Sequence, residues 1–159
     1  MKICVVGTGY VGLVTGTCFA ENGHTVCCVD IDEERIGKLR NGISPIYEPG
    51  LDELIERNQR EGRLSFSTKI KDGLEGTQLC FIAVGTPPAD DGRADLAQVL
   101  AAIDDIGSEL SHSCYIVVKS TVPVGTGTLL CKRIKSHLRG RGMEKINLEI
   151  LSNPEFLKE

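Results

Sequence analysis

The sequence predicts an α/β fold of the Rossmann type, a doubly wound and mainly parallel sheet with helices on both faces. Two observations support this prediction. Short apolar runs alternate with helical patterns along the whole chain, which is typical of parallel strands joined by crossover helices. A glycine-rich turn separates the first run from the first helical pattern. The length of 159 residues fits a single domain, which we expect over 1–159.

The first strand and the first helix are predicted from the opening residues. Residues 3–6 are apolar and largely β-branched, which indicates a buried parallel strand. After residues 7–12 a helical stretch runs to about residue 22 and ends before a glycine. Its Gly12, Gly16 and Ala20 are spaced four apart and share one face. This smooth stripe would allow the helix to lie close to the sheet.

Two strands and two helices complete the first half of the prediction. Residues 25–30 form an apolar run that ends in an acid, and 64–68 alternate like a strand. Asp32 is a suitable N-cap for a helix through residue 40. A loop rich in proline and glycine then leads to a short amphipathic helix over 51–62.

The second half repeats the alternation of strand and helix. Strands are predicted over 79–84, 115–118 and 148–151, where apolar runs stop at turn residues. The helix predicted over 95–110 has the clearest helical period in the sequence. A further helix is predicted over 125–140. Strands and helices thus alternate to the end of the chain, as a parallel sheet requires.

Composition excludes two classes of partner. Lys and Arg number 18 against 22 Asp and Glu, so the formal net charge is −4. Non-specific nucleic-acid binding needs a dense positive surface, so no nucleic-acid partner is predicted. No apolar run approaches the ~20 residues of a membrane span, and the N-terminal run is too short for a signal peptide. We therefore expect no membrane contact and a cytoplasmic protein.

The cysteines are interpreted as reduced thiols that serve as small buried hydrophobic side chains. Their number is odd, no Cys-x-x-Cys occurs, and the three histidines are isolated. No metal site is predicted, although a zinc site or a catalytic Cys–His pair stays open as the alternative. The seven are Cys4, Cys18, Cys27, Cys28, Cys80, Cys114 and Cys131.

The glycine-rich turn Gly7-x-Gly9-x-x-Gly12 follows the first strand and opens the first helix, as a dinucleotide site requires. The first glycine makes the tight turn, the second lets backbone amides approach a pyrophosphate, and the third allows close packing of helix on strand. The helix N-terminus would supply free N–H groups and a positive dipole end. A turn used only for packing, or an FAD or S-adenosylmethionine site, is the alternative.

Asp30 ends the second strand and is placed to accept hydrogen bonds from a ribose diol. A carboxylate there would repel a 2′-phosphate, so the predicted cofactor is NAD rather than NADP. Arg35 weakens this inference, because a nearby guanidinium can accommodate that phosphate.

Three polar turns follow later strands, over 84–87, 120–123 and 153–155. Ligands of open α/β sheets bind at the carboxyl ends of strands, so we expect these turns beside the glycine loop. Glu155 and Glu159 are four apart and would share a helix face, which would suit acid–base chemistry. Ordinary turn chemistry and a solvated helix start are the alternatives.

Together these residues resemble the NAD-binding domain of the UDP-glucose/GDP-mannose dehydrogenase family, over the whole chain. Members of that family oxidise the C6 alcohol of a nucleotide sugar to a carboxylate with two NAD. The sequence of 86–88 and 122–126 is more similar to that of members that oxidise UDP-glucose than to that of members that oxidise GDP-mannose. Members that act on UDP-N-acetylhexosamines are the remaining alternative. The matching segments are 2–12, 29–30, 42–51, 81–88, 94–96, 119–126 and 153–159.

The resemblance implies a role for each matching position. Glu155 matches the family's acid–base glutamate, and Glu159 would also lie near the nicotinamide. The implied catalytic residues are Glu155, Glu159 and Thr121. The implied cofactor-binding residues are Gly7, Gly9, Tyr10, Val11, Gly12, Asp30, Arg35, Gly85, Thr86, Pro87, Thr121 and Glu159. The implied substrate-binding residues are Glu155, Phe156, Leu157, Lys158 and Glu159.

One departure from the family matters for activity. The family's nucleophilic cysteine lies in a glycine-rich motif far downstream, and none of the seven cysteines here lies in such a motif. The central helix of the family's dimer and its sugar-nucleotide-binding domain are also absent. We therefore expect an N-terminal fragment of a homodimeric enzyme, inactive by itself. A stand-alone NAD-sensing module, or a dehydrogenase of hydroxyacids or sugar phosphates, is the alternative.

Overall fold

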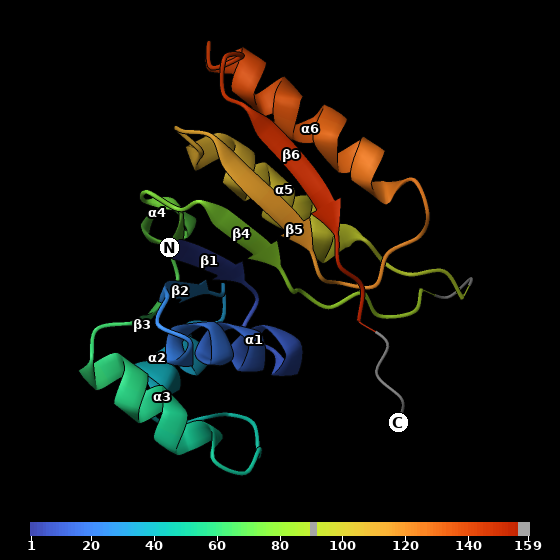
Figure 1. Cartoon of the computed structure of the whole chain (residues 1–159). Coiled ribbons are helices and arrows are strands. Elements are labelled where there is room, and N and C mark those ends of the chain that lie inside the picture. The colour runs from blue at the N-terminus through green and yellow to red at the C-terminus, as the bar shows by residue number, and fades with distance from the viewer. Residues whose placement is uncertain (90–91, 156–159) are drawn as a thin grey trace.

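The computed structural model describes residues 1–89 and 92–155, and in them a six-stranded sheet has the order β3-β2-β1-β4-β5-β6 (Figure 1). Every neighbouring pair of strands is parallel. This order reverses direction at β1, as in Rossmann folds, so the predicted fold class is confirmed. The strands are β1 (Lys2–Val6), β2 (Thr25–Val29), β3 (Leu64–Ser67), β4 (Leu79–Ile82), β5 (Cys114–Val118) and β6 (Leu148–Ser152).

Helices cover both faces of the sheet, and each face has its own apolar core (Figure 1). The helices α1, α2 and α3 lie against β1, β2 and β3 on one face, while α4, α5 and α6 lie on the other. Asp32 caps α2 as predicted, since its Oδ1 accepts a hydrogen bond from the Arg35 amide at 2.9 Å. The helices are α1 (Tyr10–Glu21), α2 (Glu33–Arg40), α3 (Leu51–Arg60), α4 (Ile70–Leu74), α5 (Ala97–Glu109) and α6 (Thr126–Gly140).

The helix α4 has no counterpart in the sequence prediction. Its five residues are too few to show a helical period, and one of them is glycine. Gly73 is needed there because a Cβ would lie 2.6 Å from Val29 Cγ2 and 2.7 Å from Cys4 Sγ. The helix therefore crosses from β3 to β4 in close contact with the sheet.

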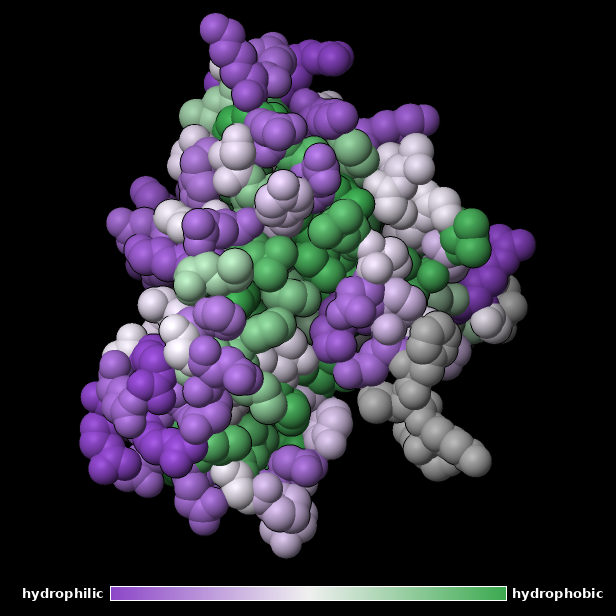
Figure 2. All heavy atoms as spheres, viewed as in Figure 1, coloured by the Kyte–Doolittle hydropathy of each residue, from purple (hydrophilic) through white to green (hydrophobic). Residues whose placement is uncertain are grey.

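On the face that carries α1, no helix of the described residues lies over β5 and β6. Phe81 of β4 is buried beside Phe19 of α1, but Figure 2 shows apolar residues exposed farther along this face. Tyr115 of β5 and Leu151 of β6 are 52% and 45% exposed. Helices therefore lie on both faces as predicted, and the part of the sheet at β5 and β6 is covered by helices on one face only. No helix in residues 1–89 and 92–155 is both long and apolar enough to cross a membrane.

The cysteines are all unpaired in the described chain, and Cys4, Cys28, Cys80 and Cys114 are buried. Burial raises the pKa of the Cys28 thiol and raises that of Cys114 to about 12, so these thiols stay protonated and inert. Cys18 departs from the prediction because it lies on the exposed side of α1. The described residues contain no group of His, Cys, Asp and Glu that could hold a metal.

A polar clamp joins α5 to α6. The Asp104 carboxylate accepts two hydrogen bonds from the Arg133 guanidinium, both at 2.6 Å, and one from His137 Nε2 at 2.8 Å. The helices approach closely at Gly107, where a Cβ would lie 2.9 Å from the Cβ of His137. The hydrogen bond from Arg133 lowers the pKa of Asp104 to about 2.

We expect Asp104→Asn to destabilise the fold above about pH 4 and to have little effect near pH 2. The pKa of an unfolded aspartate is about 3.9, so the folded state holds the charged form more strongly. Its contribution is present above that value and is lost as pH falls through the folded pKa. Asp104 is 31% exposed, and solvent screening limits the effect to roughly 1 kcal/mol. Urea titrations from pH 2 to 7, with Asp105→Asn as control, measure it; a pH-independent difference would contradict this origin.

Candidate functional site

Two adjoining cavities lie at the carboxyl ends of the strands, where β1 and β4 are neighbours and the chain departs in opposite directions. The larger has a volume of about 610 Å³ and the smaller about 370 Å³. Both are lined by Gly9 and by residues 83–85 that follow β4. The two cavities therefore meet at the glycine-rich loop, and we treat them as one site.

Two of the loop glycines are fixed by close contacts. Gly7 has φ +100°, and a Cβ there would lie 2.6 Å from the carbonyl oxygen of Ala83. A Cβ on Gly12 would overlap the carbonyl oxygen of Gly7. Gly12 thus packs against the turn itself and, less closely, against Ala83 at the end of β4, while a Cβ on Gly16 would lie 2.5 Å from Cys28 Sγ of β2. A Cβ on Gly9 would meet nothing within 4 Å, so the space before it is open.

The N-terminus of α1 presents donors that no side chain of the described residues caps. The first turn of α1 has no acidic residue, whereas the first turn of α2 has Glu33 and Glu34. Uncapped N–H groups and the positive end of the helix dipole favour an anion at this place. The open space before Gly9 lies directly in front of them.

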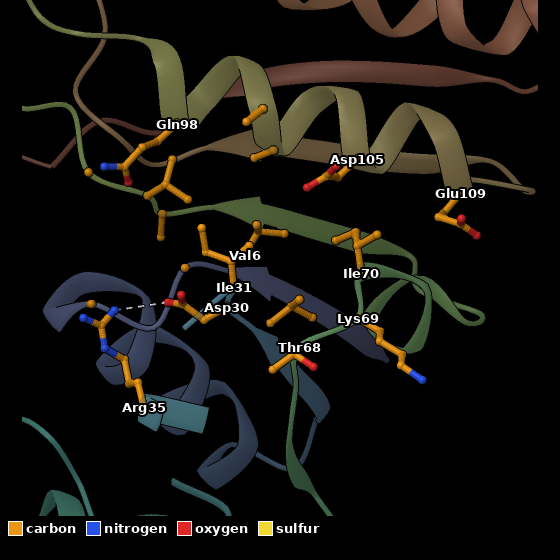
Figure 3. Close-up of a pocket in the computed structure, with 18 of the residues that line it drawn as sticks. Val6, Asp30, Ile31, Arg35, Thr68, Lys69, Ile70, Gln98, Asp105 and Glu109 are labelled. Carbon is orange, nitrogen blue, oxygen red and sulfur yellow. Dashed lines mark hydrogen bonds and ion pairs between the residues drawn. The ribbon is translucent and has the colours of Figure 1, made fainter. Parts of the chain in front are cut away.

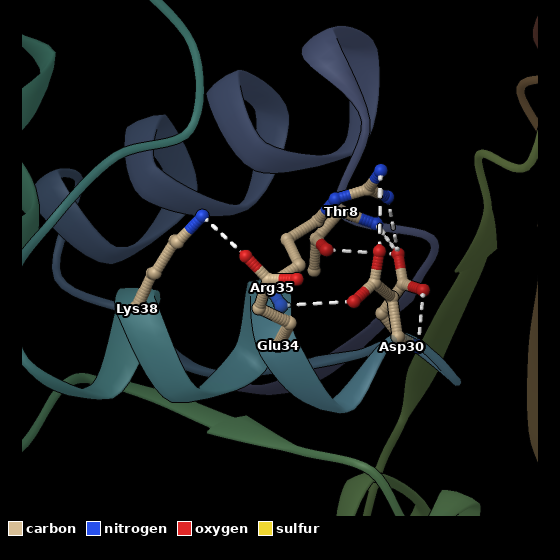
Figure 4. Close-up of polar contacts among 6 residues, drawn as sticks. Thr8, Asp30, Glu34, Arg35 and Lys38 are labelled. Carbon is tan, nitrogen blue, oxygen red and sulfur yellow. Dashed lines mark hydrogen bonds and ion pairs between the residues drawn. The ribbon is translucent and has the colours of Figure 1, made fainter.

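Asp30 is held by a dense set of donors beside the loop (Figure 4). Its Oδ2 accepts hydrogen bonds from the amide and hydroxyl of Thr8, at 2.7 and 2.8 Å, and pairs with Arg35 Nη1 at 3.3 Å. Its Oδ1 accepts from the Asp32 amide at 3.1 Å, which leaves room for one further donor. Burial alone would raise the pKa of Asp30, but these hydrogen bonds and the charge of Arg35 lower it. The carboxylate is therefore ionised and fixed in place.

The larger cavity runs from Asp30 and Arg35 along the groove between α4 and α5 (Figure 3). Its walls are mainly apolar, and Ile31 is 87% exposed at its mouth. An exposed isoleucine beside a fixed carboxylate suits a ligand with one flat apolar part and one hydroxyl-bearing part. Further lining residues are Val6, Val29, Thr68, Lys69, Ile70, Gln98, Ala101, Ala102, Asp105 and Glu109.

The smaller cavity collects polar side chains from three strand ends. Thr86 follows β4, Thr121 follows β5, and Glu155 follows β6. Lys119, also after β5, forms an ion pair with Glu155, with Nζ 3.1 Å from Oε1. The three turns that the sequence singled out therefore meet at one site, as expected from the parallel sheet.

Tyr10 also lines the smaller cavity, at the first position of α1. Its hydroxyl donates a hydrogen bond to Glu48 Oε2 at 2.9 Å. This bond raises the pKa of Tyr10, with smaller effects from the charges of Glu48 and Glu155. The loop that contains residues 42–50 is thereby tied to the rim of the site.

Most of the predicted site residues lie together, and some do not line a cavity. Gly12 and Pro87 are not among the described lining residues, although both belong to loops that shape the site. Phe156, Leu157, Lys158 and Glu159 lie outside the described residues. The residues that do line the cavities are Gly7, Gly9, Tyr10, Val11, Asp30, Arg35, Gly85, Thr86, Thr121 and Glu155.

Sequence reasoning missed three partners of these residues. Thr8 orients Asp30, Glu48 holds Tyr10, and Lys119 pairs with Glu155. Lys119 could have been found by the rule that found Thr121, because it also follows the end of β5. The other two contacts join residues 22 and 38 positions apart and leave no local signal.

A family model described as the UDP-glucose/GDP-mannose dehydrogenase family, NAD binding domain, matches residues 1–159. Among curated proteins, UDP-glucose 6-dehydrogenase YwqF of Bacillus subtilis (strain 168) is 48% identical over 159 residues, which is 100% of this chain and 35% of that protein. UDP-glucose 6-dehydrogenase of Pseudomonas aeruginosa is 47% identical over 159 residues, again 100% of this chain and 35% of the relative.

Solved structures give the same grouping. A UDP-glucose dehydrogenase from the archaeon Pyrobaculum islandicum has a TM-score of 0.89 and 40% identity, over 99% of this chain and 36% of that one. A ternary complex of GDP-mannose dehydrogenase from Pseudomonas aeruginosa has a TM-score of 0.90 and 35% identity, over 100% of this chain and 37% of that one. The chain thus spans about a third of the length of the relatives it matches.

Proposed function

The chain belongs to the UDP-glucose/GDP-mannose dehydrogenase family, as its NAD-binding domain, and from this premise we propose that it is the cofactor half of a UDP-glucose 6-dehydrogenase. One observation supports the proposal most directly: Thr86, Thr121 and Glu155 line the same cavity beside the glycine loop. A module that only senses NAD has no need of these groups at the strand ends. The family resemblance also leads us to propose a homodimer for the complete enzyme.

The residues present fit NAD on the observations already described. The pyrophosphate has open space before Gly9 and free donors at the start of α1. Asp30 keeps room on Oδ1 for a ribose hydroxyl, and the mainly apolar groove beyond it suits an adenine ring. The smaller cavity is left for the nicotinamide end of the cofactor and the sugar. When bound, NAD supplies the hydride acceptor.

The chain's own residues then bind, orient and move protons. The fixed Asp30 carboxylate would accept from the ribose diol, and the start of α1 would neutralise the pyrophosphate. Thr86 and Thr121 would hold the nicotinamide end of the cofactor through their hydroxyl groups. Glu155 would take the proton of the sugar hydroxyl, or of the attacking water, as a general base. Apolar neighbours from residues 83–84 would limit access of bulk water.

The proposed overall reaction converts one primary alcohol, two NAD⁺ and one water into a carboxylate, two NADH and three protons. Two hydrides leave the C6 carbon in turn, and the water oxygen enters the product. We propose that a sugar-nucleotide-binding domain and a nucleophilic cysteine, neither of which we find in these residues, complete the enzyme. The isolated chain is therefore expected to bind NAD without oxidising UDP-glucose.

Calorimetric titration with NAD and NADP tests the cofactor site. We expect NAD to bind at least about a hundredfold more tightly, because a 2′-phosphate would face the ionised Asp30 at the cost of several kcal/mol. Asp30→Asn should reduce this ratio to about ten or less, since it removes the charge that faces the 2′-phosphate and leaves Arg35 paired with Asp32 alone. Asp32→Asn is the matched control, because asparagine also caps a helix. A ratio unchanged in Asp30→Asn would refute this role.

The substrate is tested on the complete enzyme. Production of NADH from UDP-glucose, with two NADH for each sugar, is the expected result. A higher kcat/KM with GDP-mannose or a UDP-N-acetylhexosamine would reassign the substrate within the family. An enzyme that turns over no nucleotide sugar would overturn the proposed function and leave an NAD-binding module.

A further inference from the structure

Lys119 is a largely covered cation in the smaller cavity. Its side chain is only 12% exposed, although lysine is among the residues least often buried. Its amide donates to the carbonyl oxygen of Ile82 at 2.8 Å, so its backbone is fixed to the end of β4. The next residue, Ser120, donates from Oγ to the Val84 carbonyl at 2.6 Å. The ammonium group therefore projects from a rigid part of the sheet.

The two oxygens of Glu155 have different surroundings. Oε1 lies 3.1 Å from Lys119 Nζ, and Oε2 is buried with no hydrogen-bond donor among the described residues. A buried carboxylate oxygen without a donor is costly to maintain, and native structures retain few of them. The one cation among the described residues lining this cavity thus binds one oxygen and leaves the other unused.

We propose that Lys119 is a positioning residue, which holds Glu155 through Oε1 so that Oε2 is free to accept the proton of a substrate hydroxyl or of water. This inference rests on the proposed function, because it assigns a partner to its general base. Tyr10 does not compete for Glu155, since its hydroxyl donates to Glu48. The rigid anchor of Lys119 gives the carboxylate one orientation before substrate arrives.

A direct contact with the cofactor phosphates is the competing role for Lys119. The donors suited to the phosphates lie at the start of α1, where the glycine loop is open. The cations of the larger cavity are Arg35, Lys69 and Lys71, and Lys119 lines only the smaller one. A phosphate role would appear as weaker NAD binding, whereas positioning of Glu155 would appear in kcat.

The test uses Lys119→Met and Lys119→Arg in the complete enzyme, with NAD and UDP-glucose. We expect Lys119→Met to lower kcat about 10- to 100-fold, which is part of the effect of a positioned base, and to change the KM for NAD by about twofold or less. Lys119→Arg should retain most of the activity, because it restores the cation. Lys135→Met, at an exposed position of α6, is the matched control and should leave kcat unchanged.

A double-mutant cycle with Glu155→Gln separates the explanations. If Lys119 acts through Glu155, Lys119→Met should have almost no further effect on kcat in the Glu155→Gln background. Additive losses, or a raised KM for NAD with normal kcat, would overturn the inference while the proposed function stands. A wild-type enzyme inactive on every nucleotide sugar would overturn both. Should Lys119→Met not fold, as judged by circular dichroism, Lys119→Gln takes its place in the cycle.

Discussion

Gly12→Ala is expected to destabilise the domain and abolish NAD binding together. The added Cβ would overlap the carbonyl oxygen of Gly7, which is backbone and cannot rotate away. The turn would have to open, at a cost of about 3 kcal/mol or more. For a chain of this size that corresponds to a fall in Tm of about 10 °C. Thermal unfolding followed by circular dichroism measures the first effect, and calorimetric titration with NAD measures the second.

Gly9→Ala is the matched variant that separates binding from folding. Gly9 has φ −67°, which alanine adopts readily, and a Cβ there meets nothing within 4 Å. Stability should therefore change by about 1 kcal/mol or less. NAD affinity should still fall about a hundredfold, because the methyl group takes the place proposed for the pyrophosphate. Normal NAD affinity in folded Gly9→Ala would contradict the assignment of the loop.

The sequence was sufficient for the sheet because each strand is a short apolar run that stops at a turn. Because the strands are parallel, their carboxyl ends meet at one edge. This alone predicts that Thr86, Thr121 and Glu155 lie together, without reference to side-chain contacts. Asp30 was found in the same way, since it follows the second run. The predicted element types were right for these segments, and the ends moved by one or two residues where helices begin or strands stop.

The parts that sequence reasoning missed depend on tertiary contacts. The helix α4 is too short for a period and is held by its fit over Val29 and Cys4. The pairs Thr8–Asp30 and Tyr10–Glu48 join residues that are distant in the chain, and nothing local predicts them. The function assigned to the third glycine was incomplete, because a Cβ on Gly12 would first overlap the Gly7 carbonyl in the turn and would meet Ala83 Cβ beside β4 at 3.3 Å. The spacing of a motif identifies which residues matter, whereas tertiary packing decides which atoms these residues contact.

The proposed function assigns cofactor affinity to the larger cavity and chemistry to the smaller one. The larger one holds the fixed, ionised Asp30 and a mainly apolar groove, which suit recognition of one end of a dinucleotide. The smaller one holds Tyr10, Lys119 and Glu155 together with the two threonines that follow β4 and β5. Variants in the larger cavity should therefore alter KM or Kd for the cofactor, and variants in the smaller one should alter kcat.

Glu155→Gln in the complete enzyme is expected to lower kcat by about 10²–10⁴, the usual contribution of a positioned general base. Glutamine keeps the size of the side chain, and its carbonyl can still accept from Lys119, but it cannot take up a proton. NAD affinity and the KM for UDP-glucose should change little, because the lost step is proton transfer rather than binding.

The matched control is Glu149→Gln on β6, which is exposed and removes the same charge from the same strand region. Its kcat should equal that of the wild type. Steady-state NADH formation with UDP-glucose, measured for all three enzymes, gives the comparison. A kcat for Glu155→Gln within about threefold of wild type would be too small a loss for a general base. It would assign proton transfer to another group and leave the Lys119–Glu155 pair as a structural ion pair at the end of the sheet.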